Sequence, residues 1–294
     1  MLSEASPNPR EVGEWAMQKD GTQIMLEFHN VTMQIKDVNM HGMPYGKHHV
    51  GIITELFDIL LGLNPGYIHK EWEFYDNWRS EDGLYPYTYG ETIKKQWNKV
   101  KDKLINSNSE TRHAGMFCWD DSCHDRDFVP CTYNFHFQKI NRELCLTVTM
   151  RSQDAIKGWW LDSFLYCHIA KLMALEVGLE CGPYTVFQHN IHVYPKDSDL
   201  FALRAKQLED HQSSYIYGAQ IDRLTEEDKT KMLVALEYVY SEQSLYSSEY
   251  LDNISSDYWR SLMALIYAKR TQDETYMKYA TYDFHKQWMT KILR

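Results

Sequence analysis

The stretch MRSQDAIKGWWLD, which runs from Met150 to Asp162, contains a strand end, a turn and the first residues of a helix. Before it, Leu144–Met150 is rich in apolar and β-branched residues, which predicts a strand. After it, Trp160–Val177 has no breaker and predicts a central helix that ends at Gly178. A strand that leads through a polar turn into a buried helix indicates a mixed α/β core.

The polar residues of this stretch are candidates for chemistry. Arg151 and Ser152 can bind a phosphate, because the guanidinium fork matches phosphate oxygens. Taken alone, they are more simply explained as a solvated strand end. Asp162 begins a helix that continues with little polarity, so it is either an N-cap or a carboxylate that faces a ligand.

Two further candidates lie outside the stretch. Cys131 stands close to an expected strand at 135–138 and is a possible nucleophile. Taken alone, a single cysteine is more often a small core hydrophobe. His192 and Tyr194 share one face of an expected strand at 184–194, where they can bind two oxygens of one sugar or simply face water.

The rest of the chain extends this pattern in both directions. An N-terminal arm covers residues 1–20, an α+β catalytic domain covers 21–210, and a helical C-terminal extension covers 211–294 and packs on the same domain. The other expected elements are a strand at 24–35, helices at 50–61 and 91–104 around a Tyr/Trp/Gly-rich loop at 72–90, and helices at 196–210, 225–243 and 257–269.

Composition excludes several classes of protein. The 294 residues carry 31 Lys+Arg against 41 Asp+Glu, a net charge of −10, which argues against a nucleic-acid partner but permits a pocket for one phosphate. A hydrophobic content of 44% excludes wholesale disorder. We expect no membrane span and no signal peptide. The six scattered cysteines predict free thiols and a cytoplasmic location.

A zinc site is a weaker alternative. Cys118, Cys123 and His124, with Cys131 and His136 nearby, are residue types that bind zinc. Their spacing lacks a paired C-x-x-C or H-x-x-x-H motif, so we expect no metal. The Gly-rich fingerprints of common nucleotide-binding proteins and the G-x-S-x-G motif of hydrolases are also absent from the sequence.

Seven motifs follow one another in a fixed order along the chain: Glu55, Tyr75-Asp76-Asn77-Trp78, Tyr87-Thr88-Tyr89-Gly90, Arg112, Pro130-Cys131, Arg151-Ser152-Gln153-Asp154 with Gly158 and Asp162, and His192-Val193-Tyr194. In this order they resemble the thymidylate synthase superfamily from about Thr22 to Leu208. The resemblance implies a three-layer α/β fold around a large bent β-sheet, and a homodimer that forms through that sheet.

The resemblance also implies a chemistry. Cys131 would add to C6 of a pyrimidine nucleotide, which makes C5 a nucleophile toward the methylene group of 5,10-methylenetetrahydrofolate. Glu55 would organise water and proton transfer, and Arg112 would reach the phosphate across the dimer. The other implied roles are phosphate binding for Arg151 and Ser152, ribose binding for His192 and Tyr194, and folate contacts for Asp154, Tyr75 and Trp78.

Departures from the synthase pattern suggest a particular branch. Asp162 replaces an asparagine that reads uracil, and a protonated carboxyl there suits cytosine. Thr132 replaces a histidine, and Tyr75 replaces a tryptophan that shields an intermediate from water. The chain ends without the synthases' apolar closing segment. These features resemble deoxycytidylate hydroxymethylases, so the expected reaction converts dCMP, methylenetetrahydrofolate and water to 5-hydroxymethyl-dCMP and tetrahydrofolate.

Some positions match poorly, and alternatives stay open. Lys19 stands where the synthases have an arginine-bearing loop, and His113 where they commonly have a second arginine. A CMP hydroxymethylase, a dCMP C5-methyltransferase and a dUMP-specific enzyme are the alternatives among enzymes. A silent nucleotide- or RNA-binding homologue is the alternative outside them. The resemblance also suggests a virus that modifies its DNA or a biosynthetic gene cluster; in a virus the location would be the host cytoplasm.

Overall fold

The computed structural model describes residues 26–38, 49–107, 111–125, 129–194, 220–241 and 247–293, together with residues 197, 199 and 202. The expected N-terminal arm with Lys19, the boundary at residue 210 and most of the helix expected at 196–210 lie outside this described part. All six cysteines lie within it, and none forms a disulfide. None of the helices in these ranges is long and apolar enough to cross a membrane.

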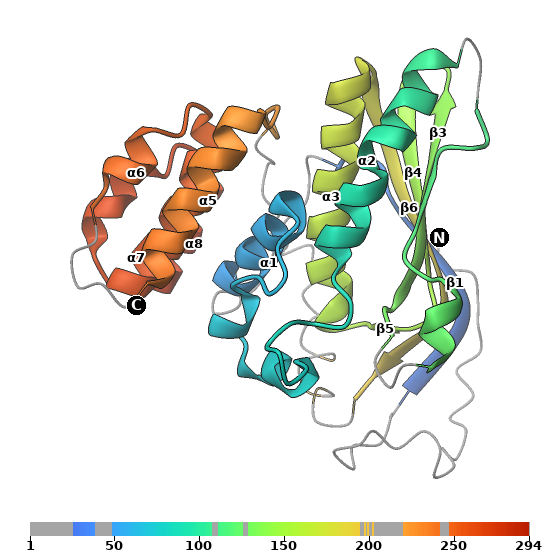
Figure 1. The fold of residues 1–294 in the computed structure, drawn as a ribbon, viewed down its shortest axis with the longest axis horizontal. Helices are drawn as coiled ribbons and strands as arrows, with labels where there is room; N and C mark the ends of the chain where they lie inside the picture. The colour runs from blue at the N-terminus through green and yellow to red at the C-terminus, as the bar shows by residue number, and fades with distance from the viewer. Residues whose placement is uncertain are drawn as a thin grey trace.

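A six-stranded sheet forms one layer of the molecule, with the strands in the order β1-β6-β4-β3-β2 and the short β5 beside β6 (Figure 1). β4 and β5 run parallel to β6, and the other neighbours pair antiparallel. The strand bounds are Leu26–Ile35 for β1, Gly115–Phe117 for β2, Thr132–Ile140 for β3, Glu143–Met150 for β4, Gln153–Asp154 for β5 and Glu180–Val193 for β6.

Alternating burial explains why most strands are predictable. Along β4, Leu144, Leu146 and Val148 are buried while the residues between them stay partly exposed. The strands expected at 24–35, 144–150 and 184–194 are thus confirmed. The strand expected at 135–138 is longer, because its flanking residues also pair with β4. β2 and β5 were not expected, since pairing with a neighbour rather than propensity forms such short strands.

The helices follow local capping signals. Thr88 caps α2 by accepting a hydrogen bond from the Glu91 backbone N–H at 3.2 Å, and Gly178 ends α3 in the left-handed region at φ 73°. The bounds are His49–Leu61 for α1, Tyr89–Asn106 for α2, Gly158–Val177 for α3, Glu226–Tyr240 for α5, Glu249–Asp252 for α6, Asp257–Thr271 for α7 and Asp283–Ile292 for α8.

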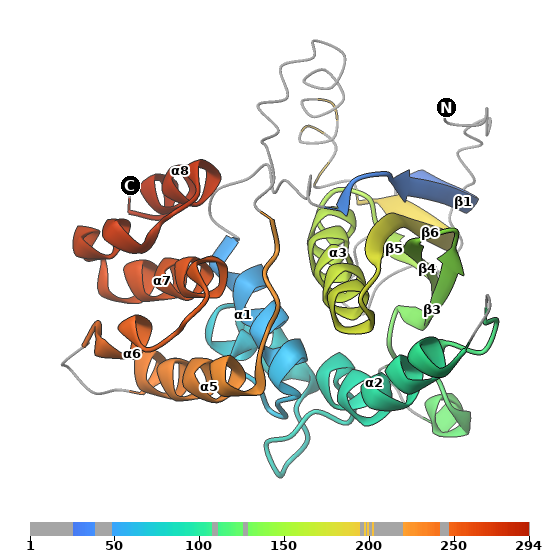
Figure 2. The same cartoon turned by 90° about the horizontal axis from the view of Figure 1, so that it is seen from above.

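The layers stack on one face of the sheet. Figure 2 shows α3 between the sheet and α1, with α5 to α8 on the far side of α1. The Tyr240 hydroxyl of α5 lies 2.8 Å from the Thr54 hydroxyl of α1, and Lys269 of α7 forms an ion pair with Glu71. The expected mixed α/β fold with a large sheet and C-terminal helices is therefore confirmed.

The loop between α1 and α2 folds back on α1. It contains two 3₁₀ helices, η3 at Ile68–Lys70 and η4 at Glu73–Trp78, in a region that the sequence predicts to be irregular. The loop approaches α1 closely at Gly51, where an added Cβ would lie 2.4 Å from the Trp72 ring. This close contact makes the loop one wall of the cavity described next.

Candidate active site

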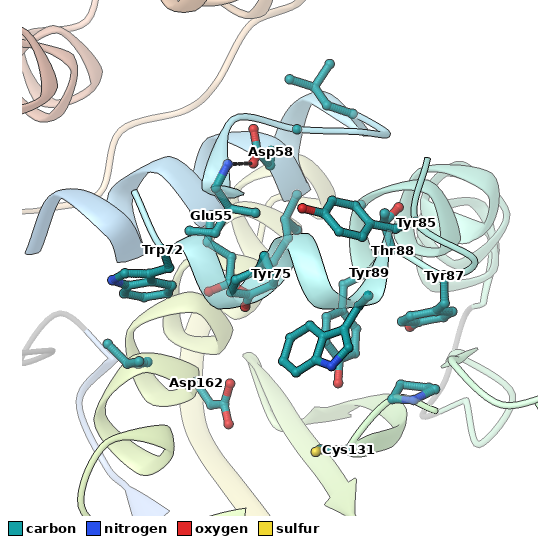
Figure 3. A pocket seen from close by; sticks show the side chains of 18 of the residues that line it. Glu55, Asp58, Trp72, Tyr75, Tyr85, Tyr87, Thr88, Tyr89, Cys131 and Asp162 are labelled. Atoms are coloured by element: carbon teal, nitrogen blue, oxygen red, sulfur yellow. Dashed lines mark hydrogen bonds between the residues drawn. The ribbon is translucent and has the colours of Figure 1, made fainter. Parts of the chain in front are cut away.

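A cavity of about 280 Å³ lies between two walls of the molecule. In Figure 3, Glu55, Tyr75 and Trp72 approach it from α1 and the following loop, and Asp162 and Cys131 approach it from the opposite side. The residues that line the cavity are Glu55, Asp58, Ile59, Leu63, Gly66, Ile68, Trp72, Tyr75, Trp78, Tyr85, Tyr87, Thr88, Tyr89, Gly90, Val129, Pro130, Cys131, Gly158, Leu161 and Asp162.

Hydrogen bonds on both sides fix the position of Cys131. Its carbonyl accepts from the Arg151 backbone N–H at 2.8 Å, which ties it to the end of β4. The next residue, Thr132, donates its N–H to the Tyr89 hydroxyl at 3.1 Å, and its own hydroxyl lies 2.6 Å from that of Tyr166. The Arg151 guanidinium donates to the carbonyls of Val129 and Pro130 at 3.2 and 3.1 Å. These hydrogen bonds hold the backbone that carries the Cys131 sulfur at the cavity.

Asp162 lies in the first turns of α3 and accepts the last hydrogen bond of a chain that runs through two buried glutamine side chains. Gln153 Nε2 donates to Asp162 Oδ2 at 2.7 Å, and Gln188 Nε2 donates in turn to Gln153 Oε1. Gln153 and Gln188 are 3% and 0% exposed. Asp162 does not cap its helix, because that helix has no side-chain cap. Of the two interpretations that the sequence leaves open, the carboxylate in a ligand cavity is the one that the geometry favours.

Two more carboxyl groups, Glu55 and Asp58, lie on the α1 side of the cavity. The Tyr75 hydroxyl donates to Glu55 Oε1 at 3.2 Å. Asp58 accepts from the backbone N–H groups of Tyr67 and Ile68 at 2.9 and 2.8 Å, which ties the loop to α1. The three carboxyl groups thus surround one small space, and the described residues that line it include neither lysine nor arginine.

Burial changes the charge of these acids. Enclosure by protein lowers the solvation of a carboxylate, so ionisation is disfavoured. Burial raises the pKa of Glu55 to about 8, with a further increase from the negative charge of Asp162 and a decrease from the Tyr75 hydroxyl. Burial likewise raises the pKa of Asp58 and that of Asp162 to about 7, and the Gln153 hydrogen bond partly offsets the increase at Asp162.

The Cys131 thiol experiences opposing influences. Burial raises its pKa, the positive charge of Arg151 lowers it, and the negative charge of Asp162 raises it further. A neutral Asp162 removes the last of these influences. The protonation states of the acid and the thiol are therefore linked.

A second group of polar residues lies where β4, β5 and β6 end. The Ser152 hydroxyl lies 3.4 Å from His192 Nδ1, and that nitrogen lies 2.9 Å from Asn190 Oδ1. The rings of His192 and Tyr194 meet edge to face with centroids 4.9 Å apart. Burial lowers the pKa of His192, which favours the neutral ring. These residues and Arg151 form a half-buried polar edge next to the Cys131 loop.

Several predicted site residues do not line the cavity. Asp154 turns toward the backbone, and its Oδ1 accepts from the N–H groups of Ile156 and Lys157 at 2.6 and 3.0 Å. Arg112 is exposed before β2, where its carbonyl lies 3.2 Å from His136 Nε2. The cavity thus brings together Glu55, Tyr75, Trp78, Cys131 and Asp162.

The structure also adds residues that the sequence analysis missed. Gln153 belongs to a matching motif but has no role of its own in the sequence analysis, and Gln188 is not singled out there; the two meet through a hydrogen bond between β5 and β6. Asp58 lies three residues after Glu55, on the same face of α1, and that helical spacing was a usable signal. Within the described part of the chain, no three His, Cys, Asp or Glu side chains are grouped to hold a metal ion.

Comparison with known proteins places the chain in a family. A family model described as thymidylate synthase matches residues 11–251. A thymidylate synthase of Fusobacterium nucleatum is 28% identical over 134 residues, which are 43% of this chain and 49% of that protein. Thymidylate synthase 1 of Bacillus subtilis is 27% identical over 144 residues, 45% of this chain and 52% of that one. The chain spans about half the length of the curated relatives it matches.

A solved structure agrees with the fold. Thermostable thymidylate synthase A from Bacillus subtilis aligns with a TM-score of 0.54 and 23% identity, over 63% of this chain and 72% of that chain. At this identity the likeness concerns the fold alone. Since the family model extends over well more than half of the sequence, the chain belongs to the thymidylate synthase family.

Proposed function

We propose that this protein is a deoxycytidylate hydroxymethylase, which converts dCMP, 5,10-methylenetetrahydrofolate and water to 5-hydroxymethyl-dCMP and tetrahydrofolate. The observation that carries the proposal is the Asp162 carboxyl, which shares one cavity with the Cys131 thiol. Burial raises its pKa to about 7, so a large share of the molecules hold it neutral near neutral pH. A neutral carboxyl offers one hydrogen-bond donor and one acceptor.

That pair of groups matches the edge of cytosine. The amino group N4 donates and the ring atom N3 accepts, so a protonated carboxyl can bond to both. An ionised Asp162 would instead turn a second acceptor toward N3. Unpaired polar groups in a buried site cost orders of magnitude in kcat/KM, so a single carboxyl proton is sufficient to affect base choice.

Cys131 supplies the nucleophile in this proposal. Its sulfur bonds to C6 of the pyrimidine, and the electron pair of the C5–C6 double bond then makes C5 nucleophilic. The thiol must first lose its proton, which the adjacent Arg151 charge favours. The hydrogen bonds around Cys131 and Thr132 hold the backbone on both sides of the sulfur, which supports a preorganised nucleophile.

The cavity fits the folate co-substrate as well. Its wall includes the rings of Trp72, Tyr75 and Trp78, on which a flat heteroaromatic group can stack. The buried Tyr85 hydroxyl lines the same cavity and has no hydrogen-bond partner among the described residues. It is thus available to a polar group of that ligand. When bound, methylenetetrahydrofolate supplies the one-carbon unit, and we propose Asp154 as a further contact.

Glu55 and Tyr75 are the residues that we propose to hold the reacting water. A carboxyl with a pKa of about 8 exchanges its proton readily near neutral pH, which suits general acid–base catalysis. The Tyr75 hydroxyl bonds to this carboxyl and brings a second polar atom to the cavity wall. A cavity wall with these two polar groups favours the binding of water at the reacting carbon.

The polar edge at the strand ends is the site that we propose for ribose and phosphate. Arg151 and Ser152 would bind phosphate oxygens, and His192 and Tyr194 would bind the sugar hydroxyl. We propose Lys19, which lies outside the described residues, as an additional phosphate ligand. This arrangement puts the charged end of the nucleotide at the half-buried edge and its ring in the cavity.

We further propose a homodimer that forms through the sheet. In Figure 2, the described α-helices that cover the sheet all lie on one face of it. Arg112 is exposed beside β2 and does not line the cavity of its own chain. A second copy on the open face would bring Arg112 to the phosphate of the partner. Mixing an Arg112→Ala protein with a Cys131→Ser protein is expected to restore part of the activity, and no recovery would contradict the shared site.

We also propose a cytoplasmic location, in the host cell if the protein is viral. The chemistry requires a free Cys131 thiol, and all six cysteines are unpaired. A reducing compartment keeps such thiols free.

Product analysis tests the function. The protein is incubated with methylenetetrahydrofolate and with dCMP, CMP or dUMP labelled with tritium at C5. We expect tritium release from dCMP and a product heavier by one hydroxymethyl group in mass spectrometry. A product heavier by a methyl group, or release mainly from CMP or dUMP, would replace the proposal with one of the related enzymes. No release from any of the three would indicate a binding protein.

A further inference from the structure

A neutral carboxyl does not by itself choose between cytosine and uracil. Its proton can sit on either oxygen, and each position gives one donor and one acceptor in opposite order. One order pairs with the amino group and N3 of cytosine. The other order pairs with O4 and the N3–H of uracil. A protein that reads cytosine through Asp162 therefore needs a second group that decides which oxygen holds the proton.

Gln153 makes the two oxygens of Asp162 different. Its Nε2 donates to Oδ2 at 2.7 Å, and no described residue donates a hydrogen bond to Oδ1. An oxygen that already accepts a hydrogen bond is best left as the carbonyl, since a carbonyl oxygen is the stronger acceptor. The proton is thereby favoured on Oδ1, and Oδ2 keeps a lone pair for a second donor.

Gln188 holds the Gln153 amide in this direction. Its Nε2 donates to Gln153 Oε1, so the acceptor end of the Gln153 amide is occupied and the donor end faces Asp162. The Gln188 Oε1 atom is buried without a hydrogen-bond partner among the described residues. Among the described residues, the Gln188 side chain therefore forms its hydrogen bond with Gln153 alone. Both glutamines are held by the strands β5 and β6, which pair at Gln153 and Ile191.

We propose that Gln153, oriented by Gln188, is a positioning residue that sets the base preference by fixing the proton of Asp162 on Oδ1. The inference rests on the proposed function, and it adds the orientation of the ring. With cytosine as the base, the amino group faces Oδ2 and N3 faces the proton on Oδ1. Uracil in the same place requires the proton on Oδ2, against the Gln153 N–H.

The test compares two substrates in one protein preparation. Gln153→Met keeps the approximate volume of the side chain and removes both amide groups. We expect its ratio of kcat/KM for dCMP to that for dUMP to fall about tenfold, the effect of one hydrogen bond to a carboxyl group. Gln188→Met is expected to lower the ratio less, by about threefold, because Gln153 remains but can turn its amide over.

The ratio separates this role from a merely structural one. Partial unfolding of a variant lowers both values of kcat/KM equally and leaves the ratio unchanged. Ser163→Ala is the matched control, since Ser163 is buried next to Asp162 and its Oγ has no partner among the described residues. Its ratio is expected to stay at the wild-type value. The ratio of dissociation constants for the two nucleotides, measured by calorimetry, gives the same information for a variant with little turnover.

The outcomes distinguish the two proposals. If the wild type prefers dCMP and both glutamine variants keep the wild-type ratio, the role of Gln153 is wrong and the function stands. If the wild type prefers dUMP, both proposals are wrong, because a proton fixed on Oδ1 disfavours uracil. A wild type that neither binds nor converts either base overturns both.

Discussion

The cavity and the polar edge at the strand ends are the two ends of the site, and they differ in the charge of the side chains that form them. Around the cavity, three carboxyl groups lie close together with no lysine or arginine among the described lining residues, and burial raises the pKa of each. At the strand ends, Arg151 and Ser152 are half-buried beside the buried His192, and all three side chains are polar or charged. One end suits a neutral ring with directional hydrogen bonds, and the other suits an anion.

Cys131 lies between these two ends, and both affect its sulfur. The Arg151 charge favours the thiolate, while burial and an ionised Asp162 oppose it. The comparison therefore predicts that substitutions at the sulfur abolish chemistry, those at the polar edge weaken nucleotide binding, and those in the acidic cavity alter pH dependence.

The largest effect is expected at the sulfur itself. Cys131→Ser should lower tritium release from C5 of dCMP by at least roughly a thousandfold, because removal of a covalent nucleophile has effects of that order or more. Binding of dCMP, measured by calorimetry, should remain within a few-fold, since serine keeps the loop contacts of the backbone. Cys123→Ser, at a buried cysteine that does not line the cavity, is the control. Full activity of Cys131→Ser would show that the Cys131 sulfur is not the nucleophile.

The polar edge is tested by Arg151→Lys. Lysine keeps the charge but not the guanidinium fork, so the bonds to the Val129 and Pro130 carbonyls and a two-point phosphate contact are lost. We expect KM for dCMP to rise by about tenfold to a hundredfold, in line with loss of charge-assisted hydrogen bonds. Arg142→Lys, at an exposed arginine in the turn after β3, should leave KM unchanged. An unaltered KM in Arg151→Lys would remove the arginine from phosphate binding.

The two ends also differ in how well the sequence predicts them. Arg151, Ser152 and His192 stand at strand ends that alternation and β-branched runs locate, so their proximity follows from the elements. Cys131 and Asp162 become candidates through the order of motifs along the chain. Strand patterns and the order of motifs can both be read from a single sequence.

The acidic cavity is less visible in the sequence. Gln153 donates to Asp162 across the turn into α3 and accepts from Gln188 of β6, and the two-residue strand β5 that carries Gln153 is too short to show periodicity. The raised pKa values likewise depend on how the loop at Gly66 covers Asp58, where an added Cβ would lie 2.1 Å from the carboxyl. Contacts between segments far apart in the sequence decide the charge state, and no local pattern reports them.

A smaller effect concerns pH. The proposed reader of cytosine is protonated Asp162, with a pKa of about 7. As pH rises above 7 its neutral fraction falls about tenfold per unit, so kcat/KM for dCMP should fall on the alkaline side unless the growing thiolate fraction compensates. Binding of dCMP to Cys131→Ser, followed by calorimetry from pH 6 to 9, isolates the acid. In the double variant with Asp162→Asn, this alkaline loss should vanish, because an amide does not titrate in this range.

The smallest expected effect is on stability, and it tests whether the cavity acids are neutral at all. The pKa of Glu55 rises from 4.5 to about 8 on folding, so between these values the folded protein holds a proton that the unfolded chain has lost. The corresponding stability is full below about pH 4.5, falls as pH rises, and is gone above about pH 8. Asp58 and Asp162 act with the same sign up to about pH 7.

Thermal unfolding of Glu55→Gln measures this contribution. Glutamine is neutral at every pH and can still accept from the Tyr75 hydroxyl, so the melting temperature of the variant should drop less than that of the wild type between pH 5 and pH 8. Each kcal/mol corresponds to roughly 2–4 °C in a protein of this size class, which makes a difference of several degrees measurable. Glu81→Gln, at an exposed position in the same loop region, should follow the wild type. If Glu55→Gln also follows the wild type, Glu55 is ionised in the folded protein. The contrast between a neutral ring pocket and a charged phosphate edge would then be wrong at this residue, and the proton for the water step would have to come from another group.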